Sequence, residues 1–314
     1  MRSALPLAIV LAAFTLPLPA QTSAGIPGVV APGAIPELVK EGFVFTEGPV
    51  GTYDGGLFFS DIGSKTIYHM DPDGKITIAR GNTLGANGLA LNASELYAAE
   101  GAGKLISRGN QNGRVATVLD KVGDEPLGAP NDIIFDTRGG FYFTDPGTAP
   151  LLPADPNRHG KVYYVASTGG REPLLVDDKI AFPNGVTITP DGKALLLDDT
   201  LGDTIWAIDL APKAKKNRGK GIMKSAFAKI PELTNGISMA DGMAVDREGR
   251  VYVATGAGIQ VFDKKGKPLG TIKVPRTPSN LAFSGPDKHT LYITAREGLY
   301  KLKMLSQGPD RIGK

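Results

Sequence analysis

The chain has 314 residues, a formal net charge of +3, 41 glycines, 24 prolines and no cysteine. So small a charge argues against nucleic acid or an anionic membrane as the partner. The absence of cysteine excludes disulfides, thiolate metal ligands and a cysteine nucleophile. A hydrophobic fraction of 41% is ordinary for a soluble protein with a sizeable core.

The first residues predict an export signal. Met1-Arg2 precedes an apolar run from Leu5 to Leu16, which is followed by prolines and small residues. This pattern is typical of a secretory signal peptide, and the run is shorter than the ~20 residues of a membrane span. We assign residues 1–24 to the signal peptide and the start of a tether, and residues 25–36 to a flexible linker. We therefore expect a periplasmic or secreted protein without a membrane anchor after cleavage.

One pattern recurs along the rest of the chain: an oxygen-bearing residue opens a short strand, and a glycine-rich turn and a second strand follow. The copies begin at Glu47, Asn87, Asn131, Asn184, Asp241 and Asn280. Their spacing of about 40 to 57 residues is typical of propeller blades. Short β-branched and aromatic runs joined by turns such as Asp54-Gly55-Gly56 predict hairpins, and no stretch has a convincing helical period.

Six repeats of about four strands predict an all-β fold, a six-bladed β-propeller over residues 37–305. The last repeat, 280–303, has room for only three strands, so the strand expected at 37–45 should join the last blade and close the ring. Residues 306–314 are expected to form a polar C-terminal tail. A closed ring has no free sheet edge, which favours a monomer.

Two insertions interrupt the repeats. The proline-rich segment from Gly147 to Gly160 follows the second strand of the third blade. It is either a loop that shapes a substrate site or a long connection without such a role. The basic segment from Lys213 to Lys224 lies in the fourth blade, where a solvated hairpin tip is the favoured interpretation over an anion or membrane patch.

The innermost strands of a propeller begin beside a common axis, so the six residues that open the repeats should converge. Two carboxylates and several amide oxygens form the kind of all-oxygen site that hard cations prefer, and Ca²⁺ fits it better than Zn²⁺. The alternative is that these Asn and Asp side chains bond only to the backbone of turns.

Other catalytic signatures are missing from the sequence. It contains no G-x-S-x-G and no H-E-x-x-H motif. The three histidines, His69, His159 and His289, do not lie at metal-ligand spacing, and only His159 is placed where the proline-rich insertion could bring it to a substrate. Metal-assisted hydrolysis by water therefore has few competitors if the protein is an enzyme.

The ordered set of motifs resembles the SMP-30/gluconolactonase (regucalcin-like) family of six-bladed propellers over about residues 40–303. The motifs are Glu47-Gly48-Pro49, Leu57-Phe58-Phe59-Ser60-Asp61, Ala86-Asn87-Gly88-Leu89, Pro130-Asn131-Asp132, Phe141-Tyr142-Phe143-Thr144-Asp145-Pro146, Pro183-Asn184-Gly185, Asp241-Gly242-Met243 and Leu291-Tyr292-Ile293-Thr294-Ala295.

The resemblance implies hydrolysis of a lactone, a gluconolactonase-like sugar lactone or related ester, by water that a divalent metal activates at the central channel. Ca²⁺ is the first expectation for this metal, with Zn²⁺, Mn²⁺ and Mg²⁺ as alternatives. The implied metal ligands are Glu47, Asn131, Asn184 and Asp241. Asp241, as general base, and Asn131 are the implied catalytic residues, and the residues expected to contact the substrate are Asn87, Asn131, Asp132 and His159.

The sequence also departs from this family. Gly51 stands where bacterial members commonly carry Trp, the segment 100–104 lacks a His that they often have, and Ala129-Pro130 stands where mammalian members carry Arg. The identity of the substrate therefore stays open. The alternative functions are a non-catalytic periplasmic binding or scaffold propeller with a structural calcium, and a phosphotriesterase-like or strictosidine-synthase-like propeller.

Overall fold

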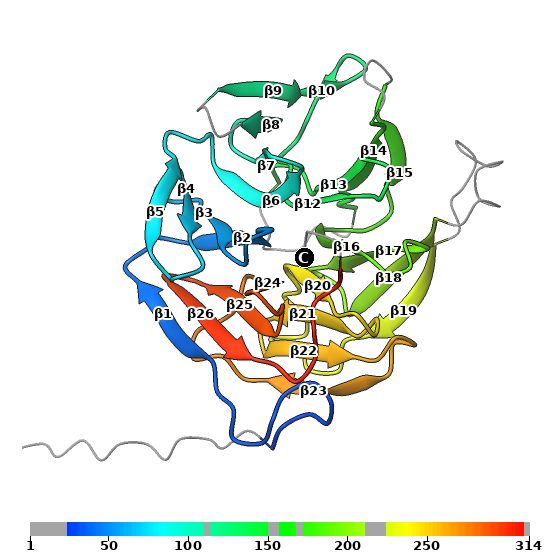
Figure 1. Ribbon diagram of the computed structural model, residues 1–314. Coiled ribbons are helices and arrows are strands. Elements are labelled where there is room, and N and C mark those ends of the chain that lie inside the picture. The colour runs from blue at the N-terminus through cyan, green and yellow to red at the C-terminus, as the bar shows by residue number, and fades with distance from the viewer. Residues whose placement is uncertain (1–23, 110–113, 150–156, 168–171, 211–223, 311–314) are drawn as a thin grey trace, which may run out of the picture.

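The computed structural model describes residues 24–109, 114–149, 157–167, 172–210 and 224–310 (Figure 1). Residues 1–23 of the expected signal peptide, 150–156 of the proline-rich insertion, most of the basic segment and the last four residues lie outside the described residues. All elements of the described residues are strands. No helix in these residues is long and apolar enough to cross a membrane.

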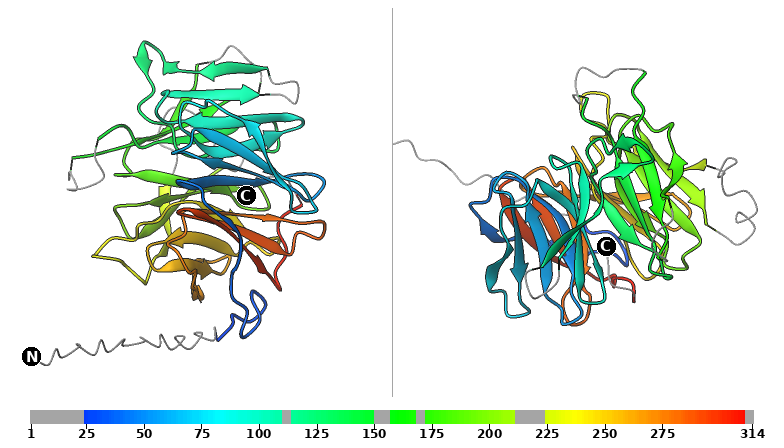
Figure 2. Two further views of the ribbon diagram at one scale, coloured as in Figure 1. Left: turned by 90° about the vertical axis from the view of Figure 1, so that its left-hand side faces the viewer. Right: turned by 90° about the horizontal axis from the view of Figure 1, so that it is seen from above.

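The strands form six blades around a central axis, as predicted (Figures 1 and 2). Each blade is a four-stranded antiparallel sheet whose first strand is innermost. Blade 1 contains β2 (Thr46–Gly51), β3 (Leu57–Asp61), β4 (Thr66–Met70) and β5 (Ile76–Arg80). Blade 2 contains β6 (Ala86–Asn92), β7 (Glu95–Glu100), β8 (Leu105–Gly109) and β9 (Val115–Leu119). A short hairpin of β10 (Lys121–Val122) and β11 (Glu125–Pro126) follows.

The other four blades repeat this arrangement. Blade 3 contains β12 (Ile133–Phe135), β13 (Phe141–Asp145), β14 (Lys161–Val165) and β15 (Leu174–Asp177). Blade 4 contains β16 (Pro183–Ile188), β17 (Ala194–Asp199), β18 (Thr204–Asp209) and β19 (Lys224–Lys229). Blade 5 contains β20 (Met243–Val245), β21 (Val251–Thr255), β22 (Gly258–Phe262) and β23 (Pro268–Ile272). Blade 6 contains β24 (Asn280–Ser284), β25 (Thr290–Ala295), β26 (Gly298–Lys303) and β1 (Glu37–Glu41).

The closure of the ring by the N-terminal strand is confirmed. In blade 6 the strand order is β24, β25, β26, β1, so β1 is the outermost strand and pairs antiparallel with β26. One sheet therefore contains residues from both ends of the chain. This pairing closes the ring by backbone hydrogen bonds.

The inner strands all start at one end of the blades. At the opposite end, several tight turns have the sequence Asp-x-x-Gly. Gly139 has a φ of 77°, a region open to glycine at little cost, and Asp136 Oδ1 accepts the backbone N–H of Arg138 and Gly140. This short pattern specifies a tight hairpin at several places in the described blades. The same turn recurs at Asp71–Gly74, Asp246–Gly249 and Asp263–Gly266.

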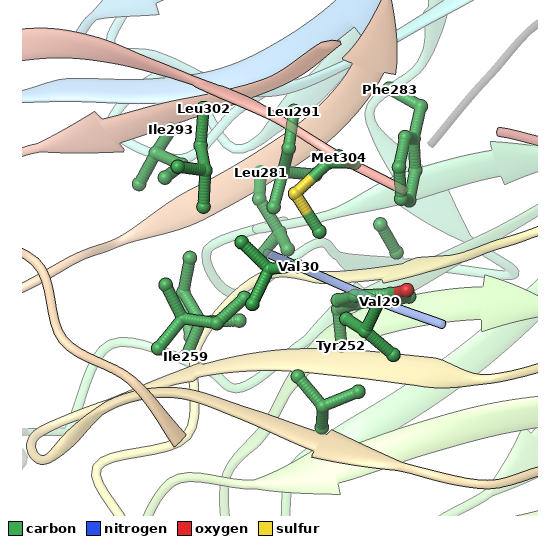
Figure 3. Packing of buried hydrophobic residues seen from close by; sticks show 14 of the residues in the cluster. Val29, Val30, Tyr252, Ile259, Leu281, Phe283, Leu291, Ile293, Leu302 and Met304 are labelled. Carbon is green, nitrogen blue, oxygen red and sulfur yellow. The ribbon is translucent and has the colours of Figure 1, made fainter. Parts of the chain in front are cut away.

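Residues 26–30 differ from the flexible linker that the sequence suggests. Val29 and Val30 are buried in the core between blades 5 and 6, where they pack with Tyr252, Ile259 and Leu281 (Figure 3). Leu305 N donates a hydrogen bond to Val29 O at 2.8 Å. We define this core, together with residues 26–30, as the 5–6 seam. Small apolar residues in a Pro/Gly-rich segment suggested a tether, but here they fill space between two blades.

The C-terminal residues also pack onto the propeller, at the end opposite the inner-strand starts. The Ser306 side chain is buried and hydrogen-bonds the Tyr252 hydroxyl at 2.8 Å. Arg247 N donates to Gln307 O, and Lys288 Nζ donates to Pro309 O at 2.7 Å. Residues 306–310 of the expected polar tail are therefore anchored to blades 5 and 6.

Candidate functional site

The six residues that open the repeats form a closed circle around the axis, which we call the inner ring. Each blade contacts the next through its ring residue, through the residue after it, or, in blade 3, through Thr144, which lies beside Asn131 in the sheet. The linking contacts are Gly48 with Asn87, Gly88 N to Asn131 O at 2.8 Å, Thr144 Oγ1 to Asn184 O at 2.7 Å, Gly185 with Asp241, Gly242 with Asn280, and Asn280 Nδ2 to Glu47 Oε2 at 3.0 Å. The chain around these six residues therefore forms a closed circle, in which the side chains of Glu47 and Asn280 hydrogen-bond each other. Convergence of all six side chains stays a prediction.

Glycine after the ring residue lets neighbouring blades approach this closely. A Cβ on Gly48 would lie 2.0 Å from Asn87 O, and a Cβ on Gly185 would lie 2.1 Å from Asp241 O. Any side chain at these positions would force adjacent blades apart. The glycines at these positions therefore determine how closely the inner strands of adjacent blades approach.

An acidic residue ends the second strand in blades 1 to 4 and holds the loop that leads into the same blade's ring residue. We call these acids the loop clamps. The bonds run from Val44 N and Phe45 N to Asp61, from Leu84 N to Glu100, from Gly128 N and Ala129 N to Asp145, and from Phe182 N to Asp199. Since the clamped N–H groups lie two or three residues before the ring residue, the clamps fix the position of the backbone that leads into it.

The clamp of blade 1 shows the electrostatics. Asp61 is almost fully buried, and burial alone would raise the pKa of its carboxyl. The backbone N–H groups of Phe45 and Val44, with Ser64, outweigh burial and lower the pKa below its ordinary value of 3.8. Asp61 is therefore ionised and accepts hydrogen bonds from the loop that immediately precedes Thr46 and Glu47.

Glu47 and Asn280 form a hydrogen-bonded pair inside the ring. Leu281 N donates to Asn280 Oδ1, so the Nδ2 group is the one that faces Glu47. Glu47 Oε2 also accepts the N–H of Gly48 at 2.8 Å. Asn280 thus presents a donor where the sequence suggested another oxygen ligand, and its role is to orient the Glu47 carboxylate.

The orientation of the Asn184 amide is determined by its neighbours. The Thr200 hydroxyl donates its proton to Ala240 O at 2.6 Å, so Thr200 Oγ1 can only accept from Asn184 Nδ2, at 3.0 Å. Asn184 Oδ1 is therefore left buried, and within the described residues no donor reaches it. The same holds for Asn87 Oδ1.

The two amide oxygens indicate whether a cation could bind in the ring. A buried polar atom without a partner is costly, and a bound cation would satisfy it. Glu47 and Asp241 supply the carboxylate charge, and the donor set is entirely oxygen, as hard cations prefer. No three His, Cys, Asp or Glu side chains of the described residues gather at one point, so amide oxygens would have to complete the ligand shell. The ring fits Ca²⁺ on these terms.

The other expected site residues divide into two groups. Asn131 and Asp241 are partly exposed, as residues that meet a substrate must be. Asp132 is only 1% exposed, and its two oxygens accept the N–H groups of Ile133 and Val186. This burial differs from the expected contact with substrate, because Asp132 ties blade 3 to blade 4 beneath Asn131.

The described base of the proline-rich insertion packs beside the ring. Arg158 is buried, donates to Pro146 O at 2.9 Å and lies 4.4 Å from the ring centroid of Phe182, two residues before Asn184. His159, the expected substrate contact, is exposed at this end. The sequence pointed to His159 in this segment, whereas the residue that anchors it is Arg158.

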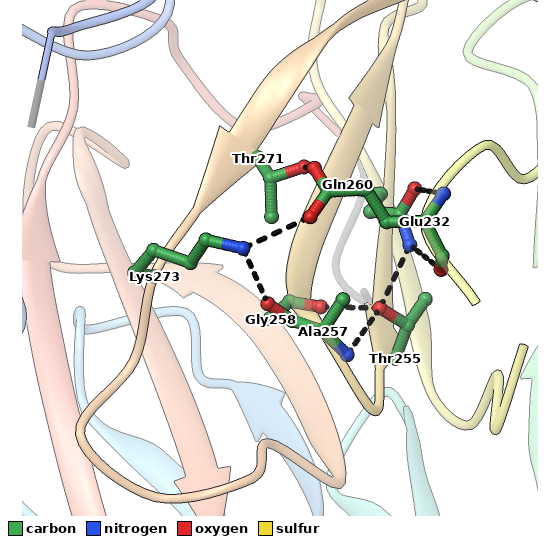
Figure 4. A network of polar contacts seen from close by, with 7 residues as sticks. All are labelled: Glu232, Thr255, Ala257, Gly258, Gln260, Thr271 and Lys273. Atoms are coloured by element: carbon green, nitrogen blue, oxygen red, sulfur yellow. Dashed lines mark hydrogen bonds and ion pairs between the residues drawn. The ribbon is translucent and has the colours of Figure 1, made fainter. Parts of the chain in front are cut away.

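The loop before Asp241 is held by a polar network on blade 5 (Figure 4). The Gln260 side chain bonds both the N–H and the carbonyl of Glu232, and the Glu232 carboxylate accepts from Thr271 and Lys273. The Thr271 hydrogen bond, with a smaller effect from Lys273, lowers the pKa of Glu232. This network fixes the start of the segment that ends at Asp241.

A cavity of about 1140 Å³ lies away from the inner ring, between the outer strands of blades 1 and 2. His69, whose ring lies 4.6 Å from that of Phe58 and tilted by 34°, and the Arg80–Glu100 ion pair line it. None of the inner-ring residues borders this cavity. His69 is thereby separated from the expected chemistry.

Sequence reasoning missed the loop clamps and Asp198, which is fully buried beside Asn184. The signal for the clamps was present, because an acid ends the second strand of four repeats. Aligning the repeats on their ring residues would have placed these acids in register. Their hydrogen-bond partners are separated in sequence, so the role itself needed the structure.

The fold and the oxygen-lined ring define a six-bladed propeller with a polar site on its axis. The profile of the SMP-30/gluconolactonase/LRE-like region matches residues 45–297. The chain belongs to this family. A gluconolactonase of Zymomonas mobilis is 24% identical over 302 residues, which cover 87% of this chain and 82% of that protein. The lactonase drp35 of Staphylococcus saprophyticus is 28% identical over 250 residues, which cover 76% and 72%.

Solved structures show the same architecture. A gluconolactonase from Xanthomonas campestris superimposes with a TM-score of 0.74 at 25% identity, covering 90% of this chain and 91% of that one. A calcium-binding regucalcin from Agrobacterium tumefaciens superimposes with a TM-score of 0.73 at 20% identity, covering 88% and 95%. The similarity to regucalcin shows a shared fold only.

Proposed function

We propose that this protein is a metal-dependent lactonase that opens a sugar lactone or related ester at the inner ring. Family membership and the relatives named gluconolactonase and lactonase support lactone hydrolysis. The observation that carries the metal is the buried, donor-free amide oxygen of a proposed ligand, Asn184 Oδ1, in a ring that also holds Glu47 and Asp241.

Glu47, Asn184, Asp241 and Asn131 would hold the cation, with Ca²⁺ the first choice because the donors are all oxygen. The calcium-binding regucalcin of the same fold is consistent with that choice. When bound, the cation supplies Lewis-acid polarisation of the lactone carbonyl. Asn280 orients the Glu47 carboxylate, and Thr200 accepts from Asn184 Nδ2, which leaves Asn184 Oδ1 available to the cation.

Proton transfer in the reaction is assigned to a residue of the chain. Asp241 accepts a proton from the attacking water, whose oxygen forms a bond to the carbonyl carbon. The ring C–O bond breaks, and the proton passes from Asp241 to the departing alkoxide oxygen, which yields a hydroxy acid. Asn131, partly exposed beside the axis, orients the substrate. Arg158 and the exposed His159 lie at the rim that the substrate would cross.

A lactone panel tests this function. We expect metal-stripped protein to be inactive and Ca²⁺, Zn²⁺ or Mn²⁺ to restore acid release in a pH-stat. Asp241→Asn should lower kcat/KM by about 10³-fold, since a general base and a ligand are lost together. The matched control Asp191→Asn removes a charge from an exposed turn of blade 4 and should leave the rate unchanged.

Each other outcome has its own meaning. No hydrolysis of any lactone or aryl ester with any of these metals would overturn the proposal. Tight Ca²⁺ binding without turnover would instead favour a binding or scaffold propeller. Turnover of a phosphotriester included in the panel would favour phosphotriesterase-like chemistry.

We also infer export and a monomeric state, both from the sequence. N-terminal sequencing of the mature protein should begin near residues 21–25, and light scattering should give the mass of a single chain. A mature protein that starts at Met1, or a dimer mass, would contradict these inferences.

A further inference from the structure

The residues opposite the inner ring on the second strands are small or carry a hydroxyl, with one exception. Glu47 pairs with Ser60 and Asn280 with Thr294, and the neighbouring registers place Asn184 opposite Asp198. The corresponding residues of the other blades are Ala99, Thr144 and Ala254. Asp198 is therefore the one charged residue among six equivalent positions, and its exposure is 0%.

Two of the three hydroxyl residues at these positions make the same contact with the next blade. Ser60 Oγ donates to Asn87 O, and Thr144 Oγ1 donates to Asn184 O, both at 2.7 Å. These two hydroxyls join their blades to the backbone of the next ring residue, whereas Thr294 Oγ1 donates to Asn280 O of its own blade at 3.2 Å. The contact is neutral and holds two blades together.

Asp198 makes a different contact at the same position. Its Oδ1 accepts the N–H of Gly185 at 3.0 Å, and a Cβ on Gly185 would lie 2.6 Å from Asp198 Oδ2 and 2.1 Å from Asp241 O. The carboxylate therefore lies where blades 4 and 5 meet, next to the backbone of both Asn184 and Asp241. A hydroxyl would suffice to join the blades, as it does elsewhere, so packing does not account for a buried charge here.

The structure places this carboxylate behind the ring. No three acidic, His or Cys side chains of the described residues gather at one point, so Asp198 is not a third carboxylate beside Glu47 and Asp241. Asp198 hydrogen-bonds the residue that follows the proposed ligand Asn184. Groups in this position around other metal sites orient the ligands and contribute charge.

We propose that Asp198 is a positioning residue of the metal centre. It holds the Gly185 amide, so that the Asn184 oxygen and Asp241 keep their places, and it adds negative charge that strengthens cation binding. This inference rests on the proposed metal-dependent function. It assigns a role to a residue whose equivalents in the other five blades have none of its charge.

Calorimetric titration of Ca²⁺ into metal-stripped protein tests it. Asp198→Asn keeps the shape and removes the charge, and Asp198→Thr installs the residue found in blades 3 and 6. We expect both variants to bind Ca²⁺ at least about 10-fold more weakly than wild type. Loss of a residue that holds a metal ligand typically lowers metal affinity by about 10- to 100-fold. Excess Ca²⁺ should restore kcat, and Asp191→Asn should bind like wild type.

A purely structural role gives a different result. If both variants lower the Tm of the metal-free protein but bind Ca²⁺ with the wild-type Kd, the inference is overturned. If Asp198→Asn fails to fold, Asp198→Thr decides the question by the same titration. Should wild type itself bind no Ca²⁺, the proposed metal dependence fails and this inference fails with it, a result separate from a variant-specific one.

Discussion

The inner ring and the 5–6 seam both contain buried side chains, but of opposite chemistry: Glu47, Asn184 and Asn280 are the buried members of the ring. The seam is built of hydrocarbon, with Val29 and Val30 filling the space between two blades. The ring is built of carboxylate and amide groups, two of whose oxygens no described donor reaches. Burial of apolar area stabilises the fold, whereas polar burial without full pairing costs stability. The seam therefore stabilises the fold, and this stabilisation offsets the cost of holding unpaired polar groups in the ring.

The largest effect on this comparison is expected from a loop clamp. Asp61→Asn replaces an ionised acceptor of two backbone N–H groups with an amide whose NH₂ group must face one of them. We expect about 2–3 kcal/mol of lost stability at pH 7 in urea unfolding, because hydrogen bonds to charged groups are worth that much. Lactonase activity should fall as well, since Glu47 lies next to the clamped loop.

The pH dependence of the same variant gives a second readout. The pKa of Asp61 is lowered on folding, so its stabilisation is complete above the ordinary value of 3.8 and is lost as the pH falls through the lowered folded value. The stability difference between wild type and Asp61→Asn should shrink in that acidic range. A difference that stays constant down to pH 2 would contradict the clamp.

The seam is tested by Val29→Ala. Val29 is fully buried, so the change should cost about 2 kcal/mol through lost transfer energy and a residual cavity. The Kd for Ca²⁺ and kcat/KM should not change, because the seam and the ring are separate. The control Val115→Ala alters an exposed strand residue and should cost less than about 0.5 kcal/mol. Equal costs for the two variants would show that residues 26–30 do not pack as described.

A smaller effect is expected from Tyr252→Phe. The hydroxyl bonds Asp246 at 2.9 Å and Ser306 at 2.8 Å, and burial raises the pKa of Tyr252. Its removal should cost about 1 kcal/mol and loosen the C-terminal residues, which limited proteolysis would detect. Tyr53→Phe, at an exposed tyrosine, should change neither stability nor proteolysis.

The smallest effect is expected from Glu232→Gln in the network of Figure 4. Thr271 and Lys273 keep the pKa of Glu232 low, but the ion pair is largely exposed and screened. The stability should change by less than about 1 kcal/mol. KM for the lactone is the more sensitive readout, because this network fixes the loop that enters Asp241. A larger loss of stability than in Val29→Ala would reverse the comparison.

The sequence predicted the propeller well because its signal is local. Each repeat carries its own ring residue, turn and strand pattern, so six weak patterns in order predicted both the propeller and its closure by a strand at 37–45, which the structure has at Glu37–Glu41. Properties that depend on a neighbouring blade could not be predicted. The Asn280 amide is turned by Leu281 and Glu47, and the Asn184 amide by Thr200 and Ala240.

The chain ends show the same limit. Residues 26–30 have the composition of a tether, and their burial depends on a space that two distant blades leave between them. Asp198 likewise looks like one of two acids at the end of a strand, and only the structure separates it from the clamp Asp199. Composition predicts local conformation, and inter-blade packing decides the role.

The central claim is that the inner ring binds a divalent cation through Glu47. The most direct measurement is isothermal titration of Ca²⁺ into metal-stripped wild type, Glu47→Gln and the control Glu95→Gln, which alters an exposed strand residue. We predict saturable binding by wild type and Glu95→Gln, and binding at least about 100-fold weaker by Glu47→Gln, which loses a carboxylate ligand. Equal binding by all three proteins, or none by wild type, would contradict a metal centre in the ring.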